Sequence, residues 1–436
     1  MINTINNLER KLSPFIFNLI VSELASSHVN SYKDLMNKNT SIWSGLILVA
    51  VNFAYSLLFF RRFSVFYTKT DSDTIIYSAN NKTIAETDRI KELIGSSGSK
   101  VLVITNVDGD FNINDIKVSF RYFPSYCFVL ISLLFQLLII ILCKRLSVRE
   151  LVCVSLAFKN IGLYYKWMQV VLRPDAERVV NFFSATTEGH VLNYVASESN
   201  INVFTYSWGS NIAALEQLYT IQDWVLLKSQ CEIGKYKRGN DVVVGDLGLK
   251  PVIVESTIID VCLIDTCFSN KFRLEEKLIM YHSIINWLTL SKIDKLHIIF
   301  HPGSEEVENT LESLSGLGVE ITSSTGNLRD VISMSGLVLN VVSTSLRDVI
   351  VSKIPCVNFA PYYFEKFLPE SSLEHFLEFS SGLDIRDMSE LKPFSNLDDF
   401  KVTCFNEQRY NGFMSRYACT QERLEHLKEL FCVSKP

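Results

Sequence analysis

The alternation of apolar and polar positions predicts short strands separated by helices along the second half of the chain. The strands expected there are residues 258–265, 296–300, 319–322, 337–342 and 354–359, and the helices between them are residues 274–290, 304–314 and 327–334. Strands that alternate with helices of about ten residues are typical of βαβ units on a parallel sheet. An aromatic-rich loop is expected at 361–364 and a last helix at 421–431.

The same alternation occurs in the first half of the chain. Its expected strands are residues 73–79, 101–105, 179–184, 202–206, 223–227 and 241–245, and its expected helices are residues 84–94, 147–172 and 191–198, the second of them amphipathic. A break at Leu249-Lys250-Pro251 separates the two halves. We therefore expect an α/β protein with two domains, residues 1–250 and 251–436, each long enough to bury its own core.

Two long apolar runs interrupt the first half. Residues 42–60 and 126–143 are almost wholly apolar, and each run is followed by or ends near a basic pair, Arg61-Arg62 or Lys144-Arg145. Their lengths approach the roughly 20 residues that a membrane-spanning helix needs. Spanning helices, monotopic insertion and unusually apolar buried helices are all compatible with such runs. We favour insertion into one leaflet, because spanning would divide a Rossmann unit and because basic ends suit anionic headgroups.

Composition narrows the class of protein. The 436 residues carry a net charge of −5, so no global basic excess points to nucleic acid. The hydrophobic fraction of 48% and mean hydropathy of +0.18 are high for a soluble enzyme, and the two apolar runs account for the excess. Ten cysteines without a C-x-x-C pair predict reduced thiols in the cytoplasm, and the start of the chain does not resemble a secretory signal.

Polar clusters follow two of the expected strands in the second half. His301-Pro302-Gly303 comes directly after residues 296–300, and Ser343-Thr344-Ser345 follows residues 337–342. Ligands of parallel α/β sheets bind at the carboxyl ends of strands. Ser345 and Asp348 have the spacing of a capping box, and the free amides of a helix start attract anions. These clusters predict a phosphate-bearing ligand; their simpler interpretations are a turn at His-Pro and a helix cap at Ser-Thr-Ser.

A His-Pro pair after one strand and a hydroxyl pair about forty residues later resemble the nucleotide half of bacterial CMP-sugar-dependent glycosyltransferases. These comprise sialyltransferases, polysialyltransferases and Kdo-type capsule transferases. The resemblance implies the GT-B fold, two Rossmann-like domains that face a cleft, often with a last helix returning to the first domain. It also implies that His301 contacts the CMP phosphate and acts as general acid. Ser343, Thr344 and Ser345 would hold the same phosphate.

The resemblance also points to a catalytic acid in the first domain. Thr187-Glu188-Gly189-His190 is similar to the acid-acid-Gly motif that carries the base in sialyltransferases, with Thr187 in place of one acid. Glu188 is the expected base, and Asp108 at the end of another strand is its rival. Gly189, His190 and the turn Ser207-Trp208-Gly209 are expected to contact substrate. A surface position is the alternative for His190, and a turn is the alternative for both acids.

We therefore expect an inverting glycosyltransferase that moves a sialic acid or Kdo-type sugar from a CMP donor to a surface glycan or glycolipid. It would lie in the cytoplasm on the inner face of the membrane. We expect the transfer to be metal-independent, because no metal-ligand pattern occurs in the sequence. No cofactor besides the donor substrate and no nucleic acid partner is expected. The alternatives are CDP-polyol phosphate transfer, a UDP-sugar donor, a UDP-sugar epimerase of the same fold, and a non-catalytic membrane-bound assembly protein.

Overall fold

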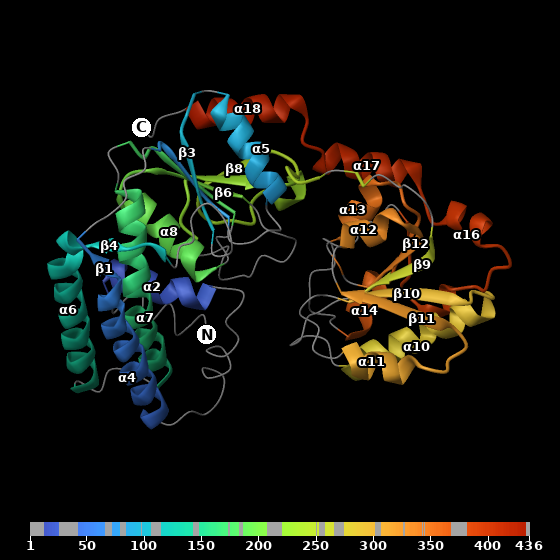
Figure 1. Cartoon of the computed structure of the whole chain (residues 1–436), viewed down its shortest axis with the longest axis horizontal. Coiled ribbons are helices and arrows are strands. Elements are labelled where there is room, and N and C mark those ends of the chain that lie inside the picture. The colour runs from blue at the N-terminus through green and yellow to red at the C-terminus, as the bar shows by residue number, and fades with distance from the viewer. Residues whose placement is uncertain are drawn as a thin grey trace. The chain divides into compact units, whose positions relative to one another are not determined.

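The chain forms two compact units, each built on its own parallel sheet (Figure 1). The first comprises Met1–Gly248 and Cys419–Pro436, and the second comprises Leu249–Ala418. The computed structural model describes residues 13–25, 42–65, 72–78, 84–96, 98–105, 115–142, 148–172, 175–182, 186–206, 220–249, 251–252, 258–265, 274–300, 307–325, 328–341, 343, 345–367 and 382–432.

The first unit contains a six-stranded sheet in which all neighbouring strands are parallel. In order across the sheet, its strands are β3 (Val101–Ile104), β2 (Thr74–Tyr77), β5 (Arg178–Asn181), β6 (Asn202–Tyr206), β7 (Trp224–Leu227) and β8 (Asn240–Val243). Strand β3 lies on one side of β2 and the later strands lie on the other. The strand order therefore reverses between β2 and β5, which makes this the topological switch point of the sheet.

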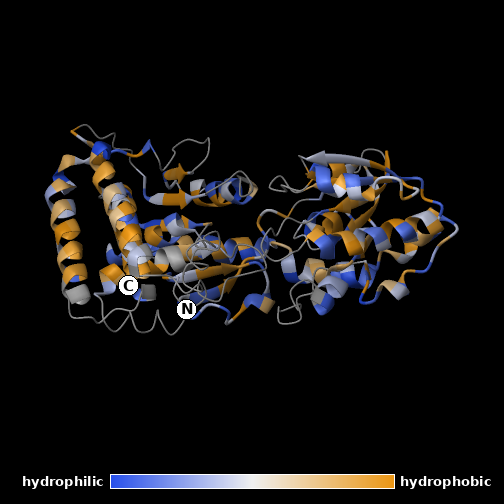
Figure 2. Cartoon of the chain, turned by 90° about the horizontal axis from the view of Figure 1, so that it is seen from below, coloured by the Kyte–Doolittle hydropathy of each residue, from blue (hydrophilic) through white to orange (hydrophobic). Residues whose placement is uncertain are grey.

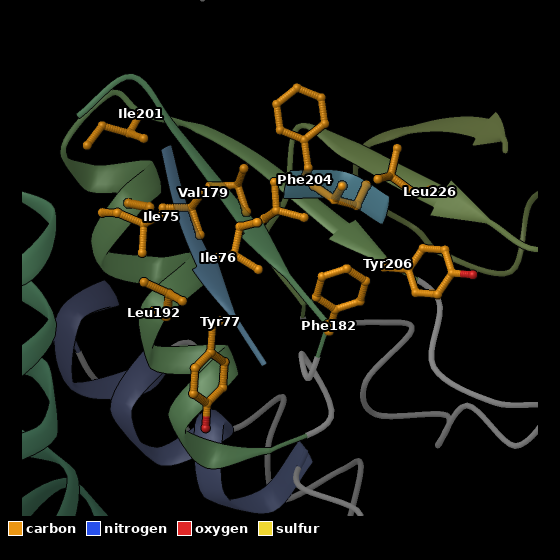
Figure 3. Close-up of a cluster of buried hydrophobic side chains, with 14 of the residues drawn as sticks. Ile75, Ile76, Tyr77, Val179, Phe182, Leu192, Ile201, Phe204, Tyr206 and Leu226 are labelled. Carbon is orange, nitrogen blue, oxygen red and sulfur yellow. The ribbon is translucent and has the colours of Figure 1, made fainter. Parts of the chain in front are cut away.

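Helices cover this sheet on both faces, so its central strands are buried at nearly every position. Helices α5 (Ile84–Gly95) and α18 (Gln421–Cys432) lie on one face and α8 (Thr187–Glu198) lies on the other (Figure 1). Ile76, Val179 and Phe204 are among the side chains that fill the core (Figure 3). Helix α8 begins four residues earlier than the sequence pattern predicted, so Glu188 lies in a helical turn.

The C-terminal helix belongs to the first unit. The rings of Phe204 and Phe431 lie 4.9 Å apart, and Leu427 is fully buried in the same core. This agrees with the returning helix that the resemblance implied, but it corrects the domain range 251–436, because residues 419–436 leave the second unit. The cause is an apolar stripe on α18 that the first unit's sheet buries.

A second core in the first unit consists of helices. It joins α2 (Pro14–Ala25), α4 (Ile42–Leu58), α6 (Phe123–Leu142) and the first part of α7 (Val148–Val171). The short 3-10 helix η1 (Phe59–Arg62) continues α4, and strands β1 (Phe63–Ser64) and β4 (Val118–Ser119) pair beside it. Helix α7 is buried along almost its whole length, so the amphipathic pattern predicted for it is wrong: neighbouring helices cover its polar side as well.

Buried polar side chains of α7 find partners in these neighbours. Asn52 Nδ2 donates to Ser155 Oγ at 3.1 Å, and Asn160 Nδ2 donates to the Leu19 carbonyl at 2.8 Å. The hydroxyl of Ser56 donates to the Phe158 carbonyl. Asn52 and Ser56 of the apolar run at 42–60 therefore face the protein, as buried polar groups require a hydrogen-bond partner.

Helices α4 and α6 are hydrophobic along most of their length (Figure 2). Their faces away from α7 expose apolar side chains. On α4 four of the exposed apolar residues recur at every fourth position. They are Trp43, Ile47, Val51 and Tyr55, at 57–71% exposure. On α6 they are Phe128, Ile131, Phe135 and Leu138, at 54–73%. By length and composition alone, Gly45–Arg62 and Phe120–Leu138 could cross a membrane, and only 28% and 22% of these segments are buried. Complete burial, one of the three alternatives, is therefore wrong.

The second unit also contains a six-stranded parallel sheet. Its order is β11 (Glu320–Thr325), β10 (Lys295–Phe300), β9 (Ile259–Ile264), β12 (Ser335–Asn340), β13 (Cys356–Asn358) and β14 (Leu383–Asp384). Numbered along the chain within this unit, the order is 3-2-1-4-5-6, that of the Rossmann fold. Its switch point lies between β9 and β12.

Helices join the strands of the second sheet much as the sequence predicted. They are α10 (Leu274–Leu290), α11 (Val307–Leu314), α12 (Leu328–Ser333) and α13 (Leu346–Val351), followed by α14 (Ala360–Phe367), α16 (Leu397–Thr403) and α17 (Glu407–Tyr417). The loop expected at 361–364 is instead the first turn of α14. Tyr363 is fully buried there, and packing of such aromatic side chains overrides the loop-like composition.

Gly162 allows α7 to approach the end of α4. A Cβ atom at this position would lie 2.6 Å from a ring carbon of Phe59, which itself stacks on Tyr126. Gly412, also inside a helix, has nothing within 4 Å of the same position. We predict that Gly162→Ala lowers the free energy of unfolding by about 1–3 kcal/mol through overpacking. Gly412→Ala should raise it by up to about 1 kcal/mol through helix propensity.

Chemical denaturation of the two variants measures this difference. Equal stability of both variants would contradict the close packing of Phe59 on α7.

Candidate active site in the first unit

Glu188 lies in the first turn of α8, directly after the switch point of the first sheet. Strand β5 ends at Asn181, and Thr186 caps the helix by accepting a hydrogen bond from the Gly189 amide at 3.1 Å. An acid in the first helical turn interacts favourably with the helix dipole. The turn expected at Glu188-Gly189 is therefore wrong, because the capped helix already includes both residues.

Two buried side chains hold this turn in place. Trp167 Nε1 donates to the Glu188 carbonyl at 2.9 Å, and Asn181 Nδ2 donates to the Gly189 carbonyl at 2.8 Å. Asn181 also bonds Asn193 further along α8, at 2.7 Å. The backbone at Glu188 is thus fixed from both α7 and β5, which is the rigid support that a functional side chain needs.

The half-buried side chain of Glu188 borders a cavity of about 350 Å³. The cavity is lined from η1 by Arg61 and Arg62, from α7 by Lys159 and Lys166, and from α8 by Thr187 and Glu188. Its volume is at the lower end of the roughly 300–1,000 Å³ usual for small-molecule sites. The candidate base therefore lies where a parallel α/β sheet places its ligands.

Basic side chains outnumber acidic ones in the described lining of this cavity. Burial, and to a lesser extent the nearby charge of Arg62, lowers the pKa of Lys166 to about 8, while Asp115 and Glu188 act in the opposite direction. Tyr77, at the end of β2, has a pKa raised by burial and by the negative charge of Glu188. Glu188 thus interacts with Lys166 and Tyr77, two groups that the sequence did not single out.

His190 is not the surface histidine that the sequence allowed. It is 1% exposed, and neither ring nitrogen has a hydrogen-bond partner among the described residues. Burial, and to a lesser extent the charge of Arg238, lowers the pKa of His190 to about 4, so the ring is neutral at physiological pH. A neutral imidazole does not attract phosphate by charge, and His190 does not line the cavity.

The second unit holds part of the expected phosphate site. Ser343 follows the end of β12, where its amide donates to Asn340 Oδ1 at 3.2 Å, and its Oγ accepts from the Ser345 amide at 3.2 Å. Ser345 makes no side-chain cap, so the predicted capping box is wrong. Asp348 instead pairs with Arg329 at 2.9 Å.

An acidic residue that the sequence analysis missed occupies the switch point of the second sheet. Asp265 directly follows β9 and pairs with Lys277 Nζ at 2.7 Å, with both side chains almost fully buried. Tyr281 also donates a hydrogen bond to this carboxylate. The sequence feature that could have identified Asp265 is its position directly after an apolar strand. Its pairing with α10 gives it a role in holding that helix to the sheet.

Several expected site residues lie outside the described part of the chain. These are Asp108, Ser207, Trp208, Gly209, His301, Pro302, Gly303 and Thr344. The described residue before His301 is Phe300, the last of β10, and β9 separates β10 from β12. The roles of these eight residues stay predictions, from its position at a strand end for Asp108 and from the resemblance for the others. Among the described residues, no three His, Cys, Asp or Glu side chains are grouped to hold a metal ion.

Solved structures of similar fold agree with the two-unit architecture. A Listeria monocytogenes protein described as a UDP-N-acetylglucosamine 2-epimerase aligns over 84% of this chain and 99% of its own, with 9% identity and a TM-score of 0.52. Another UDP-N-acetylglucosamine 2-epimerase aligns over 84% and 96%, with 10% identity and a TM-score of 0.50. No family model and no curated protein sequence matches the chain. These likenesses confirm the expected GT-B-type fold of two α/β domains with parallel sheets.

Proposed function

We propose that this protein is a glycosyltransferase that moves a sugar from a nucleotide-activated donor to an acceptor hydroxyl with inversion. The observation that carries the proposal is the position of Glu188. Its carboxylate borders a cavity at the switch point of a Rossmann-like sheet, and buried partners fix its backbone. A positioned carboxylate beside a ligand cavity is the arrangement that general-base catalysis needs.

In the proposed reaction, Glu188 accepts the proton of the acceptor hydroxyl. The acceptor oxygen forms a bond to the anomeric carbon while the bond from that carbon to the donor phosphate oxygen breaks. The nucleotide leaves with the electron pair, and stabilisation of its phosphate lowers the barrier. Resemblance assigns that stabilisation to His301 and to Ser343, Thr344 and Ser345 of the second unit.

The donor class proposed is a CMP-activated sugar of the sialic acid or Kdo type. It rests on the resemblance of the His301-Pro302 and Ser343–Ser345 motifs. The hydrogen-bonded Ser343 at the carboxyl edge of the second sheet supports a ligand on that edge. UDP-sugars and CDP-polyols are the competing donors.

An epimerase is the second candidate, since the proteins of similar fold carry that description. An epimerase acts on the nucleotide sugar alone and needs no acceptor site. The cavity beside Glu188 favours a transferase, because residues of η1 and α7 add several basic side chains to its lining. A non-catalytic assembly protein would not need the fixed carboxylate.

The proposal includes attachment to a membrane by the exposed apolar faces of α4 and α6. Insertion of α4 and α6 into one leaflet fits better than a full crossing of the bilayer, because the inner faces of both helices pack on α7. Glu150 and Lys159 of α7 would enter the hydrocarbon if the bundle crossed the bilayer. We place the protein on the cytoplasmic face.

Glu188→Gln should reduce the rate of sugar transfer by about 10²-fold or more, because the amide cannot accept the acceptor proton. Nucleotide binding should be unchanged. Glu198→Gln, at the exposed other end of α8, is the matched control and should keep normal turnover. Transfer is measured with radiolabelled or fluorescent donor. Near-normal turnover of Glu188→Gln would remove this residue as the base.

CMP should raise the melting temperature more than CDP or UDP at the same concentration, because a ligand that binds only the folded state stabilises it. His301→Ala should reduce the shift, whereas His282→Ala, an exposed histidine of the same unit, should not. Thermal-shift measurements test both statements. A shift with UDP alone would assign a UDP-sugar donor, and no shift with any nucleotide would reject the proposed function.

A double variant, Ile131→Glu with Phe135→Glu, should lose most of its flotation with lipid vesicles. Both side chains are 64% exposed, so the melting temperature should stay close to that of the wild type. Ile279→Glu with Val402→Glu, exposed at 52% and 76% in the second unit, is the control and should float normally. Wild-type protein that stays in the soluble fraction would reject membrane attachment.

A further inference from the structure

The described lining of the cavity beside Glu188 is rich in basic side chains. Four basic side chains line it, and Glu188 is the one acidic residue in its described lining. Each element contributes a pair: Arg61 and Arg62 come from η1, and Lys159 and Lys166 come from α7. Cations from two elements that converge on one cavity next to a carboxylate point to a ligand with its own negative charge.

Repulsion between these cations supports the same conclusion. The charge of Arg62 lowers the pKa of Lys166 in addition to the effect of burial. Asp115 and Glu188 raise this pKa without restoring its ordinary value. An anion in the cavity would relieve the repulsion, so its binding should favour the protonated lysine.

The cavity lies at the end of the exposed apolar stripe on α4. Tyr55 is the last member of the exposed stripe on α4 that begins at Trp43, and it lines the cavity together with Leu58. The seventeen residues of α4 span about 26 Å, so the exposed stripe is long enough to lie along an extended apolar chain. A ligand that follows this surface would have an apolar tail along α4 and an anionic group at η1.

We infer that the cavity binds the phosphate head of a membrane lipid that carries the acceptor sugar, so that the protein glycosylates a lipid-phosphate-linked glycan. This inference rests on the transferase function proposed above. Arg61, Arg62 and Lys159 hold the phosphate, the apolar tail lies against α4, and a hydroxyl of the attached sugar faces Glu188. Arginine suits this role because its guanidinium binds phosphate with two parallel hydrogen bonds.

The test measures binding of farnesyl phosphate, farnesol and inorganic phosphate to the full-length protein in non-ionic detergent, without donor. Farnesyl phosphate should bind at least about tenfold more tightly than either of the others, a difference of ~1.4 kcal/mol. Affinity should fall as the pH rises through about 8, where Lys166 loses its proton beside Arg62, Asp115 and Glu188. Equal binding of farnesyl phosphate and farnesol would overturn the inference.

The double variant Arg62→Gln with Lys159→Gln should lower the affinity for farnesyl phosphate at least about tenfold. The control variant Lys235→Gln with Lys237→Gln should keep the wild-type affinity. If the double variant melts early, Arg61→Gln, exposed on η1, supplies the same measurement. Flotation with phosphatidylglycerol vesicles measures general attraction to an anionic membrane, as distinct from binding of a lipid phosphate in the cavity. Loss of that flotation with unchanged farnesyl phosphate binding would overturn the inference.

The outcome is separable from the transferase proposal. Binding is measured without nucleotide, so equal affinity for farnesyl phosphate and farnesol rejects the lipid-phosphate acceptor even if Glu188→Gln abolishes transfer to a soluble glycan. Conversely, absence of nucleotide binding and turnover rejects the transferase, and with it the assignment of the bound lipid as an acceptor.

Discussion

Burial of α7 in two hydrophobic cores is the constraint on which the first unit depends. Its early residues, such as Phe158 and Ile161, pack in the helical core, and its later residues, such as Trp167 and Val171, pack against the sheet. A helix so enclosed cannot move without disturbing both cores, since protein interiors are close-packed. The apolar helices and the sheet are therefore one rigid body, and the cavity between η1, α7 and α8 is bounded by it.

This arrangement connects the proposed chemistry to the proposed membrane surface. Trp167 both fills the sheet core and fixes the Glu188 carbonyl, while Lys166, next to it in sequence, lines the cavity. Gly162, one turn earlier, gives Phe59 of η1 the room to approach. A single helix thus sets the positions of the candidate base, the cations and the end of the exposed apolar stripe.

Most strands could be predicted from the sequence because buried parallel strands are short, apolar and bounded by polar residues. The errors occurred where packing overrode local composition. The aromatic segment at 361–364 is helical because its rings are buried, and Glu188-Gly189 is helical because Thr186 caps the turn. Glu188 itself was predicted from a motif. The four cations of its cavity were not, because they come from segments about a hundred residues apart.

The sequence by itself determined two α/β domains, two apolar segments and an acid after a strand, because these depend on local periodicity and on residue order. Only the tertiary structure decided which faces of the apolar helices stay exposed and which polar groups turn inward. It also brought Arg61 and Arg62 to Lys159, Lys166 and Glu188 around one cavity. This grouping depends on contacts between segments that are distant in the sequence, so it cannot be predicted from the spacing of residues along the chain.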